Sequence, residues 1–479
     1  MNELHWASAM ELAAAIRQGE LSSVDLLEHL VDRIKRLDGQ VNSVVHWDLE
    51  RARAAAAAAD RMVISGAPLG TLHGVPLTIK DSFSTEGCTT TSGAPELADH
   101  VPSEDAWPVA RLRLAGAIPF AKTNLPIFAG DIQSHNEVYG TTNPHNLERT
   151  PGGSSGGSAA ALAMGFTPIE LGSDIGGSIR VPAHYSGVMG HKPSYGIVPG
   201  HGQIPGMPGT LSQADLAVVG PMARTVDDLE TMLNVIAGPD RWQREAWHLE
   251  LPGPRGSVLS DLRIAAWLDD DHCPVDTSTR RVLGELIATI EGAGGRVDTG
   301  ARPGFTLEKA DTVFQSLLFA ALSGGYSRDA IEHMAASSEP GQLGFTHRAT
   351  AARHREWLAN NERRLQIRRK WGEFFEGFDI ILLPVQPRGA IPHDHSPRSE
   401  RTVDIDGVTR AYQDLFGWTG PAGAGLLPAT VVPAGLGDDG LPIGVQIVGP
   451  FLHDRTTLQA ARLIAELCGG CPRPALALT

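Results

Sequence analysis

The sequence predicts an α/β fold with a largely buried sheet, and three observations lead to this fold class. Short apolar runs typical of strands alternate with longer segments of helical periodicity along the whole chain. The chain has 479 residues, which is enough for a large buried core. Its composition, 42% apolar and 20% charged, is ordinary for a globular protein. Length alone suggests about three domains, but large α/β enzymes often fold as one unit, and we expect a single domain over residues 1–479.

The N-terminal segment, residues 1–65, is expected to be helical. Ser8–Gln18 carries apolar residues at helical spacing, and Gly19 after it supplies a stop. Ser22 or Ser23 can cap a second helix with a regular apolar face.

After residue 65, strand-like and helical segments alternate. Thr225 with Asp228 resembles a capping box at the start of one helix. The strand-like runs are 74–81, 118–122, 263–268, 378–385, 429–434 and 443–448, and the helical segments are 111–117, 158–164, 225–236, 277–290, 310–375 and 455–467.

Charge and composition exclude several classes of protein. Forty Lys and Arg against 55 Asp and Glu give a net charge of −15, which argues against nucleic-acid or anionic-membrane binding. No secretory segment opens the chain and no run is long enough to span a membrane, so we expect a cytoplasmic protein. Cys468 and Cys471 form a C-x-x-C without a second ligand pair, which favours inert thiols over a metal site.

Two Gly/Ser segments carry the strongest chemical signal. The first, 151–158, leads directly into the helical segment 158–164, where free N–H groups favour negative charge. In the second, 172–180, the backbone amides of Ile175, Gly176 and Gly177 precede a serine, as an oxyanion hole beside a nucleophile requires. Either segment alone would be interpreted as a flexible loop.

A serine nucleophile needs a base, and Lys80 at the end of the apolar run 74–81 is a candidate. With an unperturbed pKa, about 4 in 10,000 lysines are neutral at pH 7, and keeping one neutral costs about 4–5 kcal/mol. Burial can supply this shift. A structural ion pair, with Asp81 or another acid, is the alternative for this lysine.

Together the three segments resemble the amidase-signature family. The resemblance rests on Val75-Pro76-Leu77-Thr78-Ile79-Lys80-Asp81, Gly152-Gly153-Ser154-Ser155-Gly156-Gly157 and Asp174-Ile175-Gly176-Gly177-Ser178. It covers 74–228 strongly and returns at 444–450. It implies a large, mixed and twisted central sheet with helices on both faces, and a Ser–Ser–Lys triad in which one serine follows a cis peptide bond.

Matched position by position, the resemblance makes Lys80 the base, Ser154 the bridging serine and Ser178 the nucleophile. It implies a catalytic core over 66–240. We expect residues 260–400 to form an inserted helical subdomain that lines the substrate pocket.

Other residues receive supporting roles. Ser155 is expected to bond within the first loop. Asp174 and Arg180 brace the nucleophile loop by resemblance, a surface ion pair being the alternative. Ala129, Gly130 and Gln133 are expected to line the acyl pocket, and Pro199–Pro208 is either a mobile rim or connecting coil.

The expected chemistry is hydrolysis of an amide through an acyl-enzyme. It needs no metal and no organic cofactor. The partner is a small-molecule amide, without nucleic acid or membrane, and a homodimer is left open. The segment 128–133 resembles amidases that cleave aryl, acyl or oligomeric amides and carbamates, more loosely than the triad segments.

Three local departures favour a stand-alone amidase over the glutamine-amidotransferring subunit that the family also includes. Ile175 stands where that subunit usually has threonine, His191-Lys192-Pro193 replaces Leu-Lys-Pro, and the segment 215–221 lacks the usual Asp-Gln-Ile-Gly-Pro form.

Two rival functions fit less well. Residues 153–157 satisfy Gly-x-Ser-x-Gly, which would make Ser155 an α/β-hydrolase nucleophile, but no apolar strand precedes it. A glycine-rich phosphate-binding protein would need Gly-Lys-Ser/Thr or Gly-x-Gly-x-x-Gly in a strand–helix context, and the chain has neither.

Overall fold

An eleven-stranded sheet forms the centre of the computed structural model, which describes residues 3–137 and 140–478. In spatial order the strands are β1 (Val44–Trp47), β3 (Ile118–Thr123), β2 (Pro76–Lys80), β4 (Ile169–Asp174), β6 (Val218–Ala223), β5 (Met189–Lys192), β12 (Ala429–Leu436), β13 (Pro442–Val448), β9 (Ile380–Pro384), β7 (Arg263–Ala266) and β8 (Arg296–Asp298).

The sheet is mixed. Strand β2 runs parallel to β3 and β4, and β7 runs parallel to β8 and β9, whereas the remaining neighbours pair antiparallel. The predicted α/β class with a large mixed sheet is therefore confirmed.

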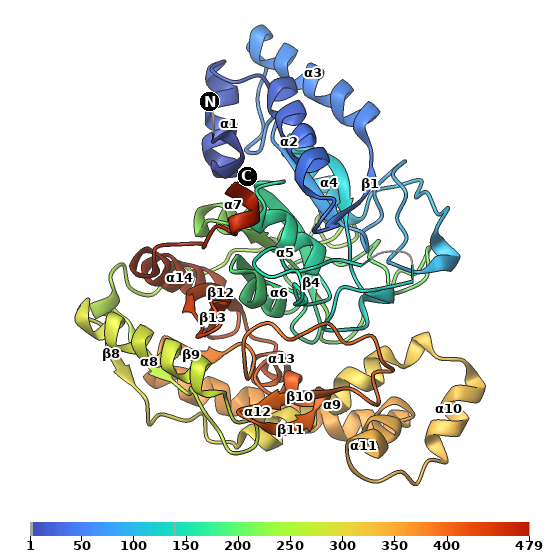
Figure 1. Ribbon diagram of the computed structural model, residues 1–479, viewed down its shortest axis with the longest axis vertical. Helices are drawn as coiled ribbons and strands as arrows, with labels where there is room; N and C mark the ends of the chain where they lie inside the picture. Colours follow the sequence, from blue (N-terminus) through green and yellow to red (C-terminus); the bar gives the residue numbers. More distant parts are fainter. Residues whose placement is uncertain (1–2, 138–139, 479) are drawn as a thin grey trace.

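Helices from distant parts of the sequence surround this sheet (Figure 1). They are α1 (Ala9–Gln18), α2 (Ser23–Leu37), α3 (Leu49–Ser65), α4 (Trp107–Leu114), α5 (Gly156–Ala163), α6 (Arg180–Ser186), α7 (Val226–Ile236), α8 (Thr277–Gly292), α9 (Leu307–Leu322), α10 (Arg328–Ala335), α11 (Gly341–Thr350), α12 (His354–Gly377), α13 (Gly420–Gly425) and α14 (Asp454–Cys468). A separate hairpin joins β10 (Thr402–Ile405) to β11 (Val408–Ala411).

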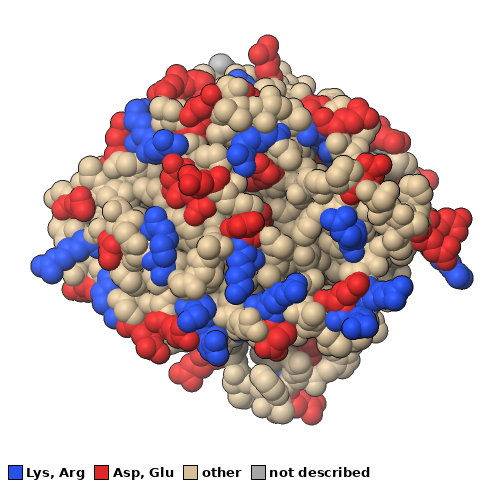
Figure 2. All heavy atoms as spheres, turned by 90° about the horizontal axis from the view of Figure 1, so that it is seen from below, with Lys and Arg blue, Asp and Glu red and all other residues tan. Residues whose placement is uncertain are grey.

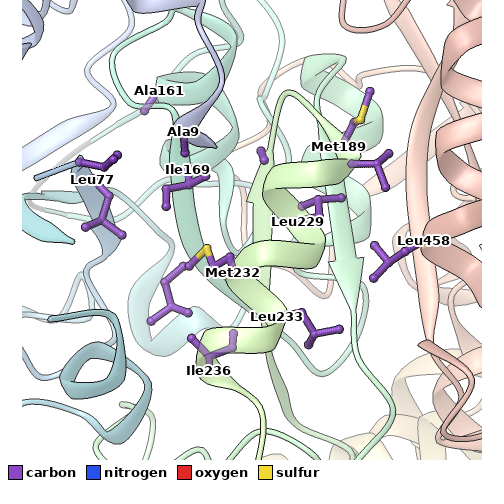
Figure 3. Close-up of a cluster of buried hydrophobic side chains, with 14 of the residues drawn as sticks. Ala9, Leu77, Ala161, Ile169, Met189, Leu229, Met232, Leu233, Ile236 and Leu458 are labelled. Atoms are coloured by element: carbon purple, nitrogen blue, oxygen red, sulfur yellow. The ribbon is translucent and has the colours of Figure 1, made fainter. Parts of the chain in front are cut away.

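Both faces of the sheet are covered, because alternate strand residues enter two different apolar clusters. In β9, Ile380 and Leu382 join a cluster with α1, α2, α7, α8 and α14, whereas Ile381 and Leu383 join a cluster with α6, α9, α12 and α13. Figure 3 shows Leu229 and Met232 of α7 in the first cluster, with Ile169 of β4 on one side and Leu458 of α14 on the other.

Side-chain caps fix where several helices begin. Ser8 caps α1, and Ser22, one of the two candidates, caps α2; each side chain accepts a hydrogen bond from the backbone N–H three residues on. Thr225 caps α7, but the predicted reciprocal box is wrong. The Asp228 carboxylate instead accepts from the backbone of Ala9 and Met10, so it ties α7 to the start of α1.

Residues 260–400 contribute both helices and strands. Strands β7, β8 and β9 belong to the central sheet, while α9 to α12 lie in the lower half of Figure 1. The division of this segment into an inserted subdomain, like the boundaries drawn at 65 and 240, stays a prediction.

The surface carries both signs of charge on the side seen from below in Figure 2, where acidic and basic side chains are interspersed. Across residues 3–137 and 140–478, no helix combines the length and the apolarity that a membrane crossing requires.

Candidate active site

Lys80 is the last residue of β2 and is fully buried. Its Nζ donates hydrogen bonds to Ser154 Oγ at 2.7 Å, Ser155 Oγ at 3.0 Å and Ser173 Oγ at 3.0 Å. Three hydroxyls therefore surround the amine, and the alternative of a structural ion pair with Asp81 does not describe these contacts. Each hydroxyl can both accept and donate a proton.

The first Gly/Ser segment lies against the end of β2. The peptide bond between Gly153 and Ser154 is cis, as the resemblance implied for one serine. Glycines are needed here because neighbouring backbone comes very close. A Cβ on Gly153 would lie 2.6 Å from the Asp131 carbonyl oxygen, and one on Gly157 would lie 2.4 Å from the Asn124 nitrogen.

The second segment turns from β4 into the short helix α6 and carries Ser178. Gly177 makes this turn at a φ of +115°, where a Cβ would also come within 2.8 Å of Thr419 Cγ2. Ser178 is 8% exposed, and its carbonyl oxygen accepts from the Ser155 backbone N–H at 3.1 Å. The two segments are thus joined, although no hydrogen bond links the Ser154 and Ser178 side chains in the described part of the chain.

The three backbone amides expected in the oxyanion hole are not equivalent. The N–H of Gly177 donates to Asp174 Oδ1 at 2.9 Å and is therefore occupied. The N–H groups of Ile175, Gly176 and Ser178 have no acceptor among residues 3–137 and 140–478. The geometry thus leaves these three N–H groups available to a developing oxyanion.

Asp174 and Arg180 form a buried ion pair, so the alternative of a surface pair is wrong. Arg180 donates to both Asp174 oxygens at 3.0 Å and reaches on to the Thr419 carbonyl and to Gln446. Burial alone would raise the pKa of Asp174, but Arg180 outweighs it and lowers that pKa to about 2. The ionised carboxylate also accepts from three backbone N–H groups and fixes the turn before α6.

Electrostatics favour the neutral form of Lys80. Burial lowers its pKa from 10.5 to about 7, against the opposing effect of Asp174 and Glu170. Near neutral pH about half of such amines are uncharged, and a neutral amine can accept a proton.

The residues expected to line the acyl pocket lie in a loop that forms hydrogen bonds with distant parts of the chain. Gln133 is buried, and its amide exchanges hydrogen bonds with the Asp394 backbone and donates to the Tyr412 hydroxyl. Gly130 accepts a hydrogen bond from Arg398 through its carbonyl. The Gln133 amide is thus engaged within the protein, and the pocket role of Ala129 and Gly130 stays a prediction.

The predicted rim at Pro199–Pro208 forms a backbone hydrogen bond to the rest of the protein near its middle. The backbone N–H of Ile204 donates to Ser82 at 2.7 Å, whereas Met207 is exposed. Whether this segment moves stays a prediction.

Sequence reasoning missed several residues at this site. Ser173 contacts Lys80, and Phe416 and Leu318 approach the amide turn: a Cβ on Gly176 would lie 3.0 Å from Phe416 Cε1 and 3.6 Å from Leu318 Cδ2. Ser173 could have been found as the residue just before Asp174 on the same strand end. Leu318 and Phe416 carry no motif, so only the fold reveals them.

Two adjoining surface cavities of about 440 and 270 Å³ contain none of the triad residues. They share Gly372 and Phe375 of α12 with Pro450 and Phe451, and arginines also line both cavities. Among the described residues no cluster of His, Cys, Asp and Glu has the arrangement of a metal site.

Comparison with known proteins places this geometry in context. The amidase family model matches residues 25–458. A glutamyl-tRNA(Gln) amidotransferase subunit of Lysinibacillus sphaericus is 32% identical over 484 residues, covering 96% of each chain. A bacterial aryl acylamidase of known structure superposes with a TM-score of 0.82 at 26% identity, covering 97% of this chain and 96% of that one. The corresponding amidotransferase subunit of Thermotoga maritima gives 0.75 at 25% identity, covering 95% of each chain.

These relatives overturn one expectation. The local departures at Ile175, 191–193 and 215–221 favour a stand-alone amidase over the amidotransferase subunit, yet a protein of that kind matches nearly the whole chain at 32% identity. For one of these departures the structure gives a reason. His191 bonds Thr430 and Asp454 rather than any of the serines, so its replacement of leucine changes packing rather than the reaction centre.

Proposed function

The chain belongs to the amidase family, and from this premise we propose that it cleaves a carbon–nitrogen amide bond with Ser178 as nucleophile, Ser154 as proton relay and Lys80 as base. One observation carries the proposal: the Lys80 amine lies among hydroxyls, 2.7 Å from Ser154, in a buried position that lowers its pKa to about 7.

The contacts around Lys80 support proton transfer from Ser178 through Ser154, and not through Ser155, to the Lys80 amine. The Ser155 hydroxyl lies 3.4 Å from the Ser173 carbonyl, to which it can donate, so it is free to accept from Lys80. Ser154 has no such competing acceptor within the described residues. It can give its proton to neutral Lys80 while it takes one from Ser178.

The reaction then follows in two steps. Ser178 Oγ attacks the amide carbon, its proton passes through Ser154 to Lys80, and the oxyanion faces the N–H groups of Ile175, Gly176 and Ser178. The proton returns through Ser154 to the nitrogen, the C–N bond breaks and the amine or ammonia leaves. Water hydrolyses the resulting ester and restores Ser178.

For the substrate, we propose the side-chain amide of glutamine, hydrolysed to glutamate and ammonia. The support is the match to a glutamyl-tRNA(Gln) amidotransferase subunit over 96% of both chains. In that case the protein acts as the glutaminase component of a larger assembly. Its small-molecule substrate is glutamine, and the cytoplasmic location expected from the sequence remains part of the proposal.

A second candidate substrate class is aryl or acyl amides, with carbamates beside them. It is favoured by the higher TM-score to the aryl acylamidase, 0.82 against 0.75, and by the apolar side chains of Leu318 and Phe416 behind Gly176.

A substrate panel tests both candidates with one preparation. Ammonia release from glutamine is compared with hydrolysis of short aliphatic amides, anilides, fatty amides and carbamates, with Ser178→Ala as the control. We expect the largest kcat/KM for glutamine and none for the variant. A larger kcat/KM for anilides or carbamates would replace the first substrate by the second. Full activity of Ser178→Ala would remove the proposed mechanism.

A further inference from the structure

A fully buried carboxyl group, Glu170, is the second residue of β4 and has no role in the mechanism above. The Thr123 hydroxyl donates a short hydrogen bond to it, and the Leu171 N–H donates at 2.8 Å. Ser158 lies 3.0 Å from the same Thr123 hydroxyl. In the described part of the chain its partners are hydroxyls and an amide, and none is a cation within ion-pair distance.

Strand register places this carboxyl on the face of the sheet that carries Lys80. The pairing of β2 with β4 aligns Thr78 with Glu170, so Lys80 lies two residues further along on the same face. For neighbouring strands this offset separates the Cα atoms by about 8 Å, within reach of two long side chains. The pairing of β2 with β3 puts Lys80 directly opposite Thr123, the donor to Glu170.

The two hydroxyls that hold Glu170 come from the elements that build the proposed active site. Thr123 ends β3, the neighbour of β2, and Ser158 lies in the first turn of α5, the helix that follows Ser154 and Ser155. The carboxyl is therefore fixed in the layer between the sheet and α5, beneath the serines.

Other charges near Lys80 are already neutralised. Asp174 is paired with Arg180 at 3.0 Å. On the far side of β2, Lys122 lies 4.0 Å from Asp81 and donates to the Phe83 carbonyl. Helix α5 contributes no charged residue. Asp174 and Glu170 both raise the pKa of Lys80, and among the described residues Glu170 is the one of the two that has no cation within ion-pair distance.

We propose that Glu170 is a positioning residue for Lys80, whose carboxylate stabilises the ammonium that forms when Lys80 takes the Ser178 proton. The inference rests on the proposed function. A buried lysine without a nearby carboxylate stays neutral easily but holds an accepted proton weakly, which makes it a poor base. Burial raises the pKa of Glu170 to about 7, which is the pH range in which Lys80 also titrates.

Glu170→Gln tests this assignment because it removes the charge and keeps the shape. The measurement is the rate at which a fluorophosphonate phosphonylates Ser178, with loss of fluoride, between pH 5 and 9, followed by mass spectrometry of the intact chain. We expect the acid limb of the rate profile to move to lower pH by about one unit and the plateau rate to fall about tenfold, since a weaker base reacts more slowly.

Thr123→Val gives an independent variant. It removes a hydrogen bond to the carboxylate, which favours the uncharged acid, so the acid limb should move in the same direction by a smaller amount. Asp228→Asn is the matched control: it also removes a buried carboxylate, but one that caps α1, so the acid limb should not move.

An acid limb of Glu170→Gln at the wild-type position would overturn the inference, even if the rate fell. Should this variant fail to fold, Thr123→Val decides by the same criterion. Failure of the wild-type chain to react at Ser178 would instead remove the proposed function itself, and the two failures are thus distinguished.

Discussion

Two buried lysines, Lys80 at the end of β2 and Lys192 at the end of β5, sit in regions of equal burial but different surroundings. Burial lowers the pKa of each to about 7. Lys80 donates to three serine hydroxyls, whereas Lys192 donates to the Pro193 and Leu427 carbonyls at 3.1 and 2.7 Å. A carbonyl only accepts hydrogen bonds, so the region around Lys192 offers no proton to transfer.

The comparison teaches that a lowered pKa is not sufficient for a catalytic base. Desolvation acts on any lysine in a core, and it affects both residues similarly. What distinguishes Lys80 is that its neighbours are hydroxyls placed at the N-terminal end of α5 and beside the Ser178 turn. Lys192 instead joins β5 to the turn after α13 through main-chain oxygens, which is a structural role.

Replacing each lysine by methionine should separate the two regions most strongly. Lys80→Met should lower kcat/KM by about 10⁴-fold, because the proton of Ser178 then has no acceptor. Lys192→Met should keep activity within about tenfold but lose roughly 1–3 kcal/mol of stability for each carbonyl left without a donor. Steady-state kinetics and thermal melts of both variants provide the measurement. A dead Lys192→Met that melts like the wild type would contradict the comparison.

Single serine replacements should rank the hydroxyls around Lys80. Ser154→Ala should reduce kcat/KM by about 10²–10³-fold, since it interrupts the proton path between Ser178 and Lys80. Ser155→Ala and Ser173→Ala remove only hydrogen bonds that orient the amine, and about fivefold losses are expected. Parallel kcat/KM measurements check this order. Equal losses for all three would mean that Ser154 has no special place in the relay.

The pH dependence of kcat/KM should arise from Lys80 and not from Lys192. Because Lys80 must be neutral to act, kcat/KM should fall about tenfold per pH unit below its pKa of about 7. Lys192→Met should leave this limb unchanged. If the acid limb of the kcat/KM profile disappeared in Lys192→Met, the titrating group would be Lys192 and not Lys80.

The pH dependence of the free energy of unfolding should depend on both lysines. Lys192→Met should therefore change it, although the same variant leaves the pH dependence of kcat/KM unchanged. Their folded pKa values lie below the unfolded value, so the unfolded chain binds more protons and stability rises with pH between about 7 and 10.5. Removing Lys192 should reduce this slope by about 1.4 kcal/mol per pH unit. Chemical denaturation at several pH values measures it.

Much of the fold could be predicted from the sequence because strands and helices differ in period and punctuation. The run that ends at Lys80 is predicted to be a strand, and it forms β2, the third strand of the sheet. The strand β4 was not recognised: Ile169–Asp174 mixes apolar residues with Glu170 and a glycine, so its pattern resembles a loop. Only its pairing with β2 and β6 makes it a strand.

The proposed site could be predicted where short motifs fix the chemistry and not where the fold supplies the neighbours. The three triad candidates follow from their motifs, and the structure brings Lys80 and Ser154 into contact. The occupied N–H of Gly177 could not be foreseen, because it depends on the rotamer of Asp174. The prediction of a stand-alone amidase was wrong about the amidotransferase subunit, because it rests on a few local residues whereas the relationship rests on similarity over the whole chain.

The smallest expected effect concerns two threonines, one in each region. Thr419 Oγ1 donates to the Gly176 carbonyl at 3.0 Å, which orients a peptide of the amide turn. Thr430 Oγ1 lies 2.8 Å from His191 in the region of Lys192 and is equally buried. Each hydroxyl makes two buried contacts, that of Thr419 also with the Phe416 carbonyl and that of Thr430 also with Thr457 Oγ1. Each valine variant loses both contacts, worth about 1 kcal/mol each.

These equal losses should appear in different measurements. Thr419→Val should lower kcat about fivefold, because the peptide that it holds links the free N–H groups of Gly176 and Ser178, and a shift of that peptide moves both away from the oxyanion. Thr430→Val should lower the melting temperature and leave kcat unchanged, since nothing it holds faces the reacting atoms. A kcat loss in Thr430→Val as large as that in Thr419→Val would mean that the two regions are coupled, and Lys192 would then belong to the proposed reaction centre after all.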